Sequence, residues 1–454
     1  MASSILEPWE SSGPNRRSRS GEEEILKLQG STSQEVVVSS DPLTGMSVTT
    51  AGVPLTTANT PPKGQVFQTS VDRVTGVPGT SKAAATRRLY IITLEDGGPP
   101  LSERAREVLG DVQPQALFKN LGMLTARLTS AQAAALERRG GVKRVEADQV
   151  VSLSRPDAAA PPPGKGPGGG GDAPAESTSQ VLDWGVKWVW GNQDRTSTIG
   201  SFASKRAFVL DTGISPNTGD LNFDKNDPIN KDFTGSRKSG FYDRNGHGTH
   251  VAGTIAAINN DRGVVGVAPG AKVFAIKVLN DQGSGTYSGI IAGIDYMMTV
   301  AGTGDVANLS LGGGYFESLN DAIQQAATEK GIRFSLAAGN SYADVDSFSP
   351  ASAGNPAAGI YTISAHDRYS KNASFTNFDN LVGAGDVDNV AYAAPGVNIT
   401  SLRIDGSTVA YSGTSMAAPH VAGLLLIGGF KVSTDLAQTF GGERTDPLAM
   451  TNLA

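Results

Sequence analysis

The second half of the chain alternates between short apolar runs and longer segments with helical periodicity. We predict strands over residues 207–210, 273–279, 306–311 and 332–338, with helices over 287–300 and over 318–331. Strands separated by helices favour an α/β fold with a mainly parallel sheet. Ligands bind at the carboxyl ends of the strands in such folds. Polar residues stand at three of the expected strand ends, which are Asp211, residues 312–314 and Asn340.

A Pro/Gly-rich stretch separates this region from what precedes it. Between Arg155 and Glu176, 12 of 22 residues are Pro or Gly, and such a segment cannot bury a core. The stretch is either a passive spacer or a site that is cut. We expect a disordered leader at 1–86, a small α+β domain at 87–153, the linker at 154–180 and a large α/β domain at 181–454.

Composition excludes several classes of function. Lys and Arg total 38 against 44 Asp and Glu, so no basic excess supports nucleic-acid binding. The longest apolar runs are far below the roughly 18 residues of a membrane span. Cysteine is absent, which excludes disulfides and Cys nucleophiles. No apolar stretch typical of a secretory signal follows the arginines near the N-terminus.

Acid–base chemistry near neutral pH falls to four histidines, His247, His250, His366 and His420. Glycines flank His247 in the motif 245–254 and allow a sharp turn before a small-residue helix. The pair His247 and His250 lacks an acidic third ligand in the motif, so we predict no metal there. We predict packing roles for His250 and His420 and a surface loop for His366.

Ser415 follows a glycine turn and opens an apolar helix that runs to residue 427. Its hydroxyl could cap that helix. It could equally be a nucleophile, because free backbone N–H groups at a helix start stabilise a developing anion. An α/β-hydrolase elbow is excluded, since it needs Gly where Ala417 stands and an acid and a base later in the chain. Residues 318–321 have the pattern of a capping box for another helix.

Asp211, His247 and Ser415 follow one another in the order in which one type of serine protease carries its catalytic Asp, His and Ser along the chain. The blocks 209–214, 247–254 and 413–420 resemble the three signature blocks of the subtilisin-like serine peptidases, and further segments are similar to their proteinase K branch. The resemblance implies a subtilisin-like three-layer α/β fold and an Asp211/His247/Ser415 triad. It also implies that Asn340 is the side-chain donor to the oxyanion, so the chain is expected to be a serine endopeptidase acting through an acyl-enzyme.

The resemblance also implies where a substrate binds. Residues Gly283, Ser284 and Gly285 are similar to the strand that pairs with an extended peptide, and the expected pocket walls are Ser310, Leu311, Gly312, Ala337, Ala338 and Gly339. These walls carry no acidic side chain, which favours apolar or small residues before the scissile bond. No cofactor is required. A structural calcium ion comes into consideration, with Asp386 and Asp388 as candidate ligands.

The segment 87–153 resembles the inhibitor-type propeptide of the same family. We therefore expect a self-processed zymogen whose own propeptide is an intramolecular inhibitor and whose other partners are protein or peptide substrates. A monomer and an extracellular location are expected. The alternative is a non-catalytic or permanently inhibited scaffold that binds peptides.

Overall fold

The computed structural model describes residues 86–153, 179–236, 240–379, 389–436 and 446–451. The chain divides into two units, 1–80 and 81–454, and all described residues lie in the second. The leader, most of the linker and the candidate ligands Asp386 and Asp388 lie outside the described residues. No helix in the described ranges is long and apolar enough to span a membrane.

The first described segment forms a four-stranded antiparallel sheet in the order β2-β3-β1-β4. Its elements are β1 (Arg88–Leu94), α1 (Leu101–Leu109), β2 (Pro114–Phe118), β3 (Met123–Leu128), α2 (Ser130–Leu136) and β4 (Val142–Ala147). Helix α2 opens with a capping box between Thr129 and Gln132. A short strand, β5 (Val150–Ser152), follows and pairs elsewhere.

A nine-stranded sheet dominates the rest of the described chain, in the order β18-β19-β15-β14-β12-β10-β6-β8-β7. Every pair is parallel except β18 with β19, which confirms the predicted mainly parallel α/β fold. The strands are β6 (Arg206–Asp211), β7 (Lys231–Asp232), β8 (Lys272–Lys277), β10 (Val306–Leu309), β12 (Arg333–Ala337), β14 (Ile360–His366), β15 (Val390–Pro395), β18 (Phe430–Leu436) and β19 (Pro447–Thr451).

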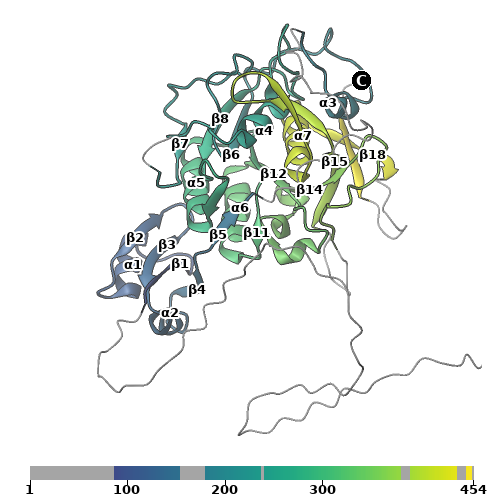
Figure 1. Ribbon diagram of the computed structural model, residues 1–454. Coiled ribbons are helices and arrows are strands. Elements are labelled where there is room, and N and C mark those ends of the chain that lie inside the picture. Colours follow the sequence, from purple (N-terminus) through teal and green to yellow (C-terminus); the bar gives the residue numbers. More distant parts are fainter. Residues whose placement is uncertain (1–85, 154–178, 237–239, 380–388, 437–445, 452–454) are drawn as a thin grey trace, which may run out of the picture. The chain divides into compact units, whose positions relative to one another are not determined.

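Helices cover both faces of this sheet and give three layers. Alternate residues of β6 face opposite sides, because Val209 packs in the same core as α4 (His247–Ala256) and α7 (Thr414–Leu426), whereas Phe208 packs with α5 (Tyr287–Val300) and α6 (Glu317–Lys330). Figure 1 shows α4 and α7 side by side on one face. Helix α3 (Trp184–Val189) packs on α7 and β15.

Short elements complete the described chain. They are β9 (Ser284–Thr286), which pairs with β5, β11 (Gly313–Gly314) with β13 (Phe348–Ser349), β16 (Ile399–Leu402) with β17 (Thr408–Tyr411), and the 3-10 turns Val345–Ser347, Ala351–Ala353 and Pro356–Ala358.

One local prediction is wrong. Helix α6 begins at Glu317 after Phe316, which makes no side-chain cap, so Ser318 does not open a capping box. Instead, the N–H groups of Glu317 and Ser318 donate to the carboxylate of Glu146, at 3.1 and 2.9 Å. A distant acidic residue therefore caps this helix. The C-terminal stop at Gly331, with φ of 65°, is as expected.

Candidate active site

Asp211 and His247 form a buried pair at the carboxyl edge of the sheet. Asp211 ends β6 and is fully buried, and His247 is the first residue of α4. His247 Nδ1 lies 2.8 Å from Asp211 Oδ1 and 3.0 Å from Oδ2. A carboxylate accepts only, so Nδ1 carries the proton and Nε2 is left as the basic nitrogen.

The electrostatics of His247 favour its charged form. Burial works to lower the pKa of His247, but the charge and hydrogen bond of Asp211 and the charge of Asp243 outweigh it, and the pKa is raised above 6.5. A histidine whose pKa is shifted by burial and by a neighbouring carboxylate is typical of catalytic sites.

Glycine at position 248 allows α4 to begin this close to β6. A Cβ on Gly248 would lie 2.2 Å from the carbonyl oxygen of Gly213 and 3.2 Å from Asp211 Oδ1. Gly246 precedes the helix with φ of 105°, a backbone conformation that L side chains rarely adopt. The glycines seen in the sequence therefore set the approach of His247 to Asp211.

Ser415 lies near the start of α7 and is 9% exposed. Its Oγ donates to the carbonyl of Ser310 at 3.1 Å, and Ser310 Oγ donates to the carbonyl of Ser415 at 2.8 Å. The N-cap residue of α7 is Gly413, which makes no side-chain cap, so the interpretation of Ser415 as a helix cap is wrong.

The sheet places Ser415 beside the Asp211/His247 pair. Ser310 directly follows β10, and β10 is the parallel neighbour of β6, with Asn308 opposite Val209. Continuing this register puts Ser310 next to Asp211, and neighbouring strands lie roughly 5 Å apart. The hydroxyl therefore stands at the adjacent strand end but points to Ser310, so it must rotate to reach His247.

Asn340 is held next to Ser415 by its neighbour Thr414. The backbone N–H and hydroxyl of Thr414 donate to Asn340 Oδ1 at 2.9 and 3.0 Å, and the Thr414 hydroxyl accepts from the N–H of Gly339 at 3.0 Å. These two bonds fix the amide oxygen of Asn340 beside the first turn of α7. No role was predicted for Thr414 from the sequence.

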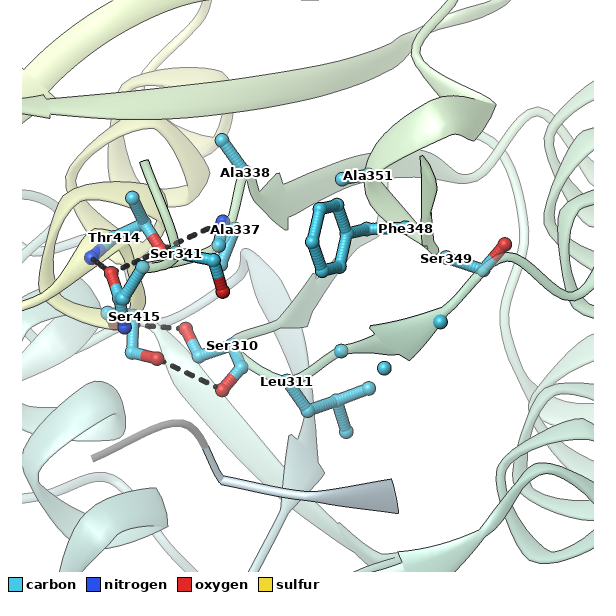
Figure 2. Close-up of a pocket in the computed structure, with 15 residues that line it drawn as sticks. Ser310, Leu311, Ala337, Ala338, Ser341, Phe348, Ser349, Ala351, Thr414 and Ser415 are labelled. Carbon is cyan, nitrogen blue, oxygen red and sulfur yellow. Dashed lines mark hydrogen bonds between the residues drawn. The ribbon is translucent and has the colours of Figure 1, made fainter. Parts of the chain in front are cut away.

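A pocket of about 140 Å³ adjoins these residues. All six predicted wall residues line it, together with Asn340, Thr414 and Ser415, and its further lining residues are Gly313, Gly314, Ser341, Phe348, Ser349 and Ala351. Figure 2 shows the ring of Phe348 pointing into the pocket toward Ala337. None of these lining residues is charged. Phe348 was missed because it reaches the pocket only through the pairing of β11 with β13.

The three residues expected to bind an extended peptide already have a strand partner. Gly285 lies opposite Val151 and Ser284 opposite Ser152 in the antiparallel pair β9–β5, and the N–H of Leu153 donates to the carbonyl of Gly283 at 2.8 Å. Val151 is 1% exposed and packs in the core that includes Leu311.

The other three histidines are buried and neutral. Burial lowers the pKa of His250 and of His420 to about 3, in line with packing roles. His366 was expected on the surface, but it is fully buried at the end of β14, with its ring 4.5 Å from that of Trp188. Burial lowers its pKa to about 4. The prediction failed because α3 covers this strand end.

One group of oxygen atoms surrounds the side-chain amide of Gln180. Gln180 Nε2 donates to the carbonyl of Ile258 at 2.9 Å and lies 3.4 Å from three further oxygens, those of Asn260 Oδ1, Arg262 O and Val264 O. Asn260 also binds the buried carboxylate of Asp220, at 2.7 Å. An amide nitrogen has two hydrogens for these four acceptors, whereas calcium takes six to eight oxygen ligands.

A second acidic group lies elsewhere. The carboxylates of Asp344, Asp346 and Asp379 come within 4.8 Å of one another, and Asn389 donates to Asp346 at 2.8 Å and to Asp379.

Comparison with known proteins finds a matching family and similar peptidases. Residues 208–427 match the model of the subtilase family. The chain is 33% identical over 346 residues to Proteinase R of Parengyodontium album, covering 74% of this chain and 77% of that protein. It is 30% identical over 350 residues to the thermostable alkaline protease of Halalkalibacterium halodurans, covering 75% and 81%. A solved cold-adapted subtilisin-like serine proteinase is 31% identical, with a TM-score of 0.49 over 61% of this chain and 99% of that one.

Proposed function

The chain belongs to the subtilase family and is a serine-type endopeptidase, and from this premise we propose that Asp211, His247 and Ser415 are its catalytic triad. The observation that carries the proposal is the Asp211–His247 pair at the strand end adjacent to that of Ser310, which holds the Ser415 hydroxyl. Its direct test is the loss of peptide hydrolysis in the variant Ser415→Ala, with the fold retained by circular dichroism.

The mechanism follows from where the protons lie. Substrate binding turns the Ser415 hydroxyl from Ser310 toward His247 Nε2, since catalytic hydrogen bonds often form only in the complex. His247 takes the hydroxyl proton as Oγ attacks the peptide carbonyl, and it then gives that proton to the leaving amine. Asp211 holds the tautomer and stabilises the imidazolium. A water molecule, deprotonated by His247, releases the acyl group from Ser415.

The developing oxyanion is met by two donors. These are the backbone N–H of Ser415, at the positive end of α7, and the amide nitrogen of Asn340, whose oxygen Thr414 fixes. Losing one such side-chain donor costs roughly 3–4 kcal/mol of transition-state stabilisation.

The pocket supports a preference for apolar residues before the scissile bond. Phe348, Leu311 and Ala337 contribute apolar surface, and no lining residue could pair with Lys or Arg. We expect peptides with Leu or Phe at this position to be hydrolysed with kcat/KM at least about tenfold above matched Lys peptides. Equal values for the two would remove this part of the proposal.

We further propose that residues 87–153 are an intramolecular inhibitor. The carboxylate of Glu146 caps α6 as described, and that of Asp148 accepts from the N–H and hydroxyl of Ser288 in the first turn of α5, at 3.0 and 2.6 Å. The residues of β5 that follow pair with β9, the strand with which a substrate would pair. We expect Asp148→Ala to weaken this inhibition, so that proteolytic activity appears earlier after expression than in the parent chain.

The occupied strand also bears on where the linker is cut. It runs from Val151, whose side chain lies near Gly313, to Leu153, whose side chain lies near Gly283, a residue that is itself close to Asn245. The chain is therefore heading toward His247, and we expect self-cleavage in the first residues of the linker rather than in its centre. N-terminal sequencing of the mature enzyme tests this, and equal processing of the Ser415→Ala variant would show that another protease makes the cut.

We also propose that the oxygen group around Gln180 holds a structural calcium ion. Asp220, Asn260 and the carbonyls of residues 258, 262 and 264 would hold it, with Gln180 turned to present its amide oxygen. The ion would join three separate segments and so stabilise the fold without a role in the reaction. We expect a chelator to lower the melting temperature of the parent and to have no such effect on Asp220→Asn.

We propose that the mature enzyme acts outside the cell and is a monomer, which culture fractionation and size-exclusion chromatography test. The competing scaffold, which would bind peptides without hydrolysing them, is not favoured by any contact at Ser415.

A further inference from the structure

We propose that Asp243 is a positioning residue of the active site, whose buried carboxylate fixes the start of α4 and places a second negative charge near His247. The inference rests on the proposed function, because it assigns Asp243 a role through His247. Asp243 is 4% exposed and lies in the loop between β7 and α4.

The carboxylate of Asp243 accepts five hydrogen bonds. Oδ1 accepts from the hydroxyl of Thr212 and the N–H groups of Asn245 and Gly246, each at 2.9 Å. Oδ2 accepts from the N–H and the hydroxyl of Thr249, at 2.9 and 2.6 Å. Only an ionised carboxylate can accept from all five donors. Within the described ranges, no Lys or Arg forms a salt bridge with Asp243.

These contacts join the two catalytic elements. Thr212 follows Asp211, and its N–H donates to Asp211 Oδ1 at 2.7 Å. Its hydroxyl donates to Asp243 and accepts from the N–H of Gly248 at 2.9 Å. Asp243 thus orients the Thr212 hydroxyl so that its lone pair faces the helix. The end of β6 and the first turn of α4 are thereby fixed to each other.

The first turn of α4 depends on this arrangement because its N-cap residue supplies no side-chain acceptor. Its N-cap is Gly246, which has no side chain. The N–H of Gly248 is satisfied by Thr212 and that of Thr249 by Asp243. Unsatisfied N–H groups at a buried helix start are costly, so loss of the Asp243 carboxylate would allow the helix start, and with it His247, to move.

The charge of Asp243 also acts on the imidazole. The charged or titratable groups facing His247 are Asp211 from β6, Asp243 from the loop, and His250 from α4 itself, which is neutral. The positive end of α4 opposes protonation. Lys277 of β8 pairs with Asp211 in register but binds the carbonyl of Thr212 and Asp281. Asp243 therefore reinforces Asp211 in stabilising the imidazolium that forms during each proton transfer.

The test measures the pKa of His247 without requiring turnover. The full chain with Ser415→Ala is labelled with ¹³C at its histidines and titrated by NMR from about pH 5 to about pH 9. The chain has four histidines, and burial places the pKa values of the other three at about 3 or 4. His247 is then the one expected to titrate in this range.

Two substitutions are compared in that background. Asp243→Asn removes the charge and keeps the size. Asp183→Asn is the matched control, because Asp183 is likewise buried and accepts the N–H groups of Gly185 and Thr400 at 2.7 and 2.9 Å. We expect Asp243→Asn to lower the pKa of His247 by about one unit and Asp183→Asn to leave it unchanged. An unchanged pKa in folded Asp243→Asn would overturn the inference.

A second variant covers the case in which Asp243→Asn does not fold. Thr249→Val removes one donor to Asp243 and leaves the charge of Asp243, although it also removes the acceptor of the Ser215 N–H. In the processed enzyme we expect kcat to fall about tenfold with little change in KM, because positioning is lost and not substrate binding. An unchanged kcat would contradict the positioning role. A lowered His247 pKa, found while the parent chain with Ser415 intact hydrolyses no peptide, would support the inference while refuting the proposed function.

Discussion

Replacing Gly248 by Ala tests whether the approach of α4 to β6 sets the catalytic geometry. A Cβ at this position would lie 2.2 Å from the carbonyl oxygen of Gly213, whereas such contacts are essentially never below 3.0 Å. The helix start must therefore move away by about 1 Å, and a displacement of that size can cost roughly a hundredfold in rate. We expect kcat to fall by about two orders of magnitude, equivalent to about 2.7 kcal/mol.

The loss should come from position and not from unfolding. Alanine favours helix over glycine by about 1 kcal/mol, and local overpacking costs roughly 1–3 kcal/mol of the 5–15 kcal/mol of a typical domain. The control is Gly302→Ala, since nothing lies within 4 Å of a Cβ at that position. The assay is hydrolysis of a peptide with Leu before the scissile bond, with self-processing followed on a gel. A kcat for Gly248→Ala within about threefold of the control would refute the reasoning.

Two further predictions concern the same site. Asn340→Ala should lower kcat by about 10²–10³ with KM little changed, because the lost donor acts on the oxyanion and not on bound substrate; a change confined to KM would place Asn340 in substrate binding instead. The pH dependence follows from the raised pKa of His247, since the base must be neutral to accept the Ser415 proton. Activity should be retained at high pH and fall as the pH drops through a midpoint above 6.5, and a midpoint of kcat/KM below 6.5 would contradict the electrostatics assigned to Asp211 and Asp243.

Much of the catalytic arrangement was predictable from the sequence because it depends on local patterns. Asp211 directly follows an apolar strand, and His247 and Ser415 each stand at a helix start marked by glycine. Parallel strands carry such residues to one edge of the sheet, and the resemblance to the subtilisin-like family selected Asp211, His247 and Ser415 among them as the expected triad.

Other features depend on pairings that no local pattern reveals. Phe348 enters the pocket through the short β11–β13 pair, and the oxygen group around Gln180 consists largely of backbone carbonyls, which have no signature in the sequence. His366 looked like a loop residue because its strand ends there, yet the tryptophans of α3 cover it. Asp243 resembled an ordinary loop residue, and only its five donors distinguish it.

The side-chain rotamer of Ser415 also could not be predicted from the sequence. The motif predicts a nucleophile, but in the structure the hydroxyl donates to Ser310. If Ser415 is the nucleophile, as proposed, its side chain must rotate away from Ser310 before attack.

Covalent labelling tests the central claim, that His247 and Asp211 activate Ser415, most directly. The processed enzyme is treated with a fluorophosphonate probe, which reacts with activated serines, and the modified peptide is identified by mass spectrometry. We predict one adduct, on Ser415, which is absent from Ser415→Ala and strongly reduced in His247→Ala. A folded, processed enzyme that is not labelled, or that is labelled equally well without His247, would contradict the account.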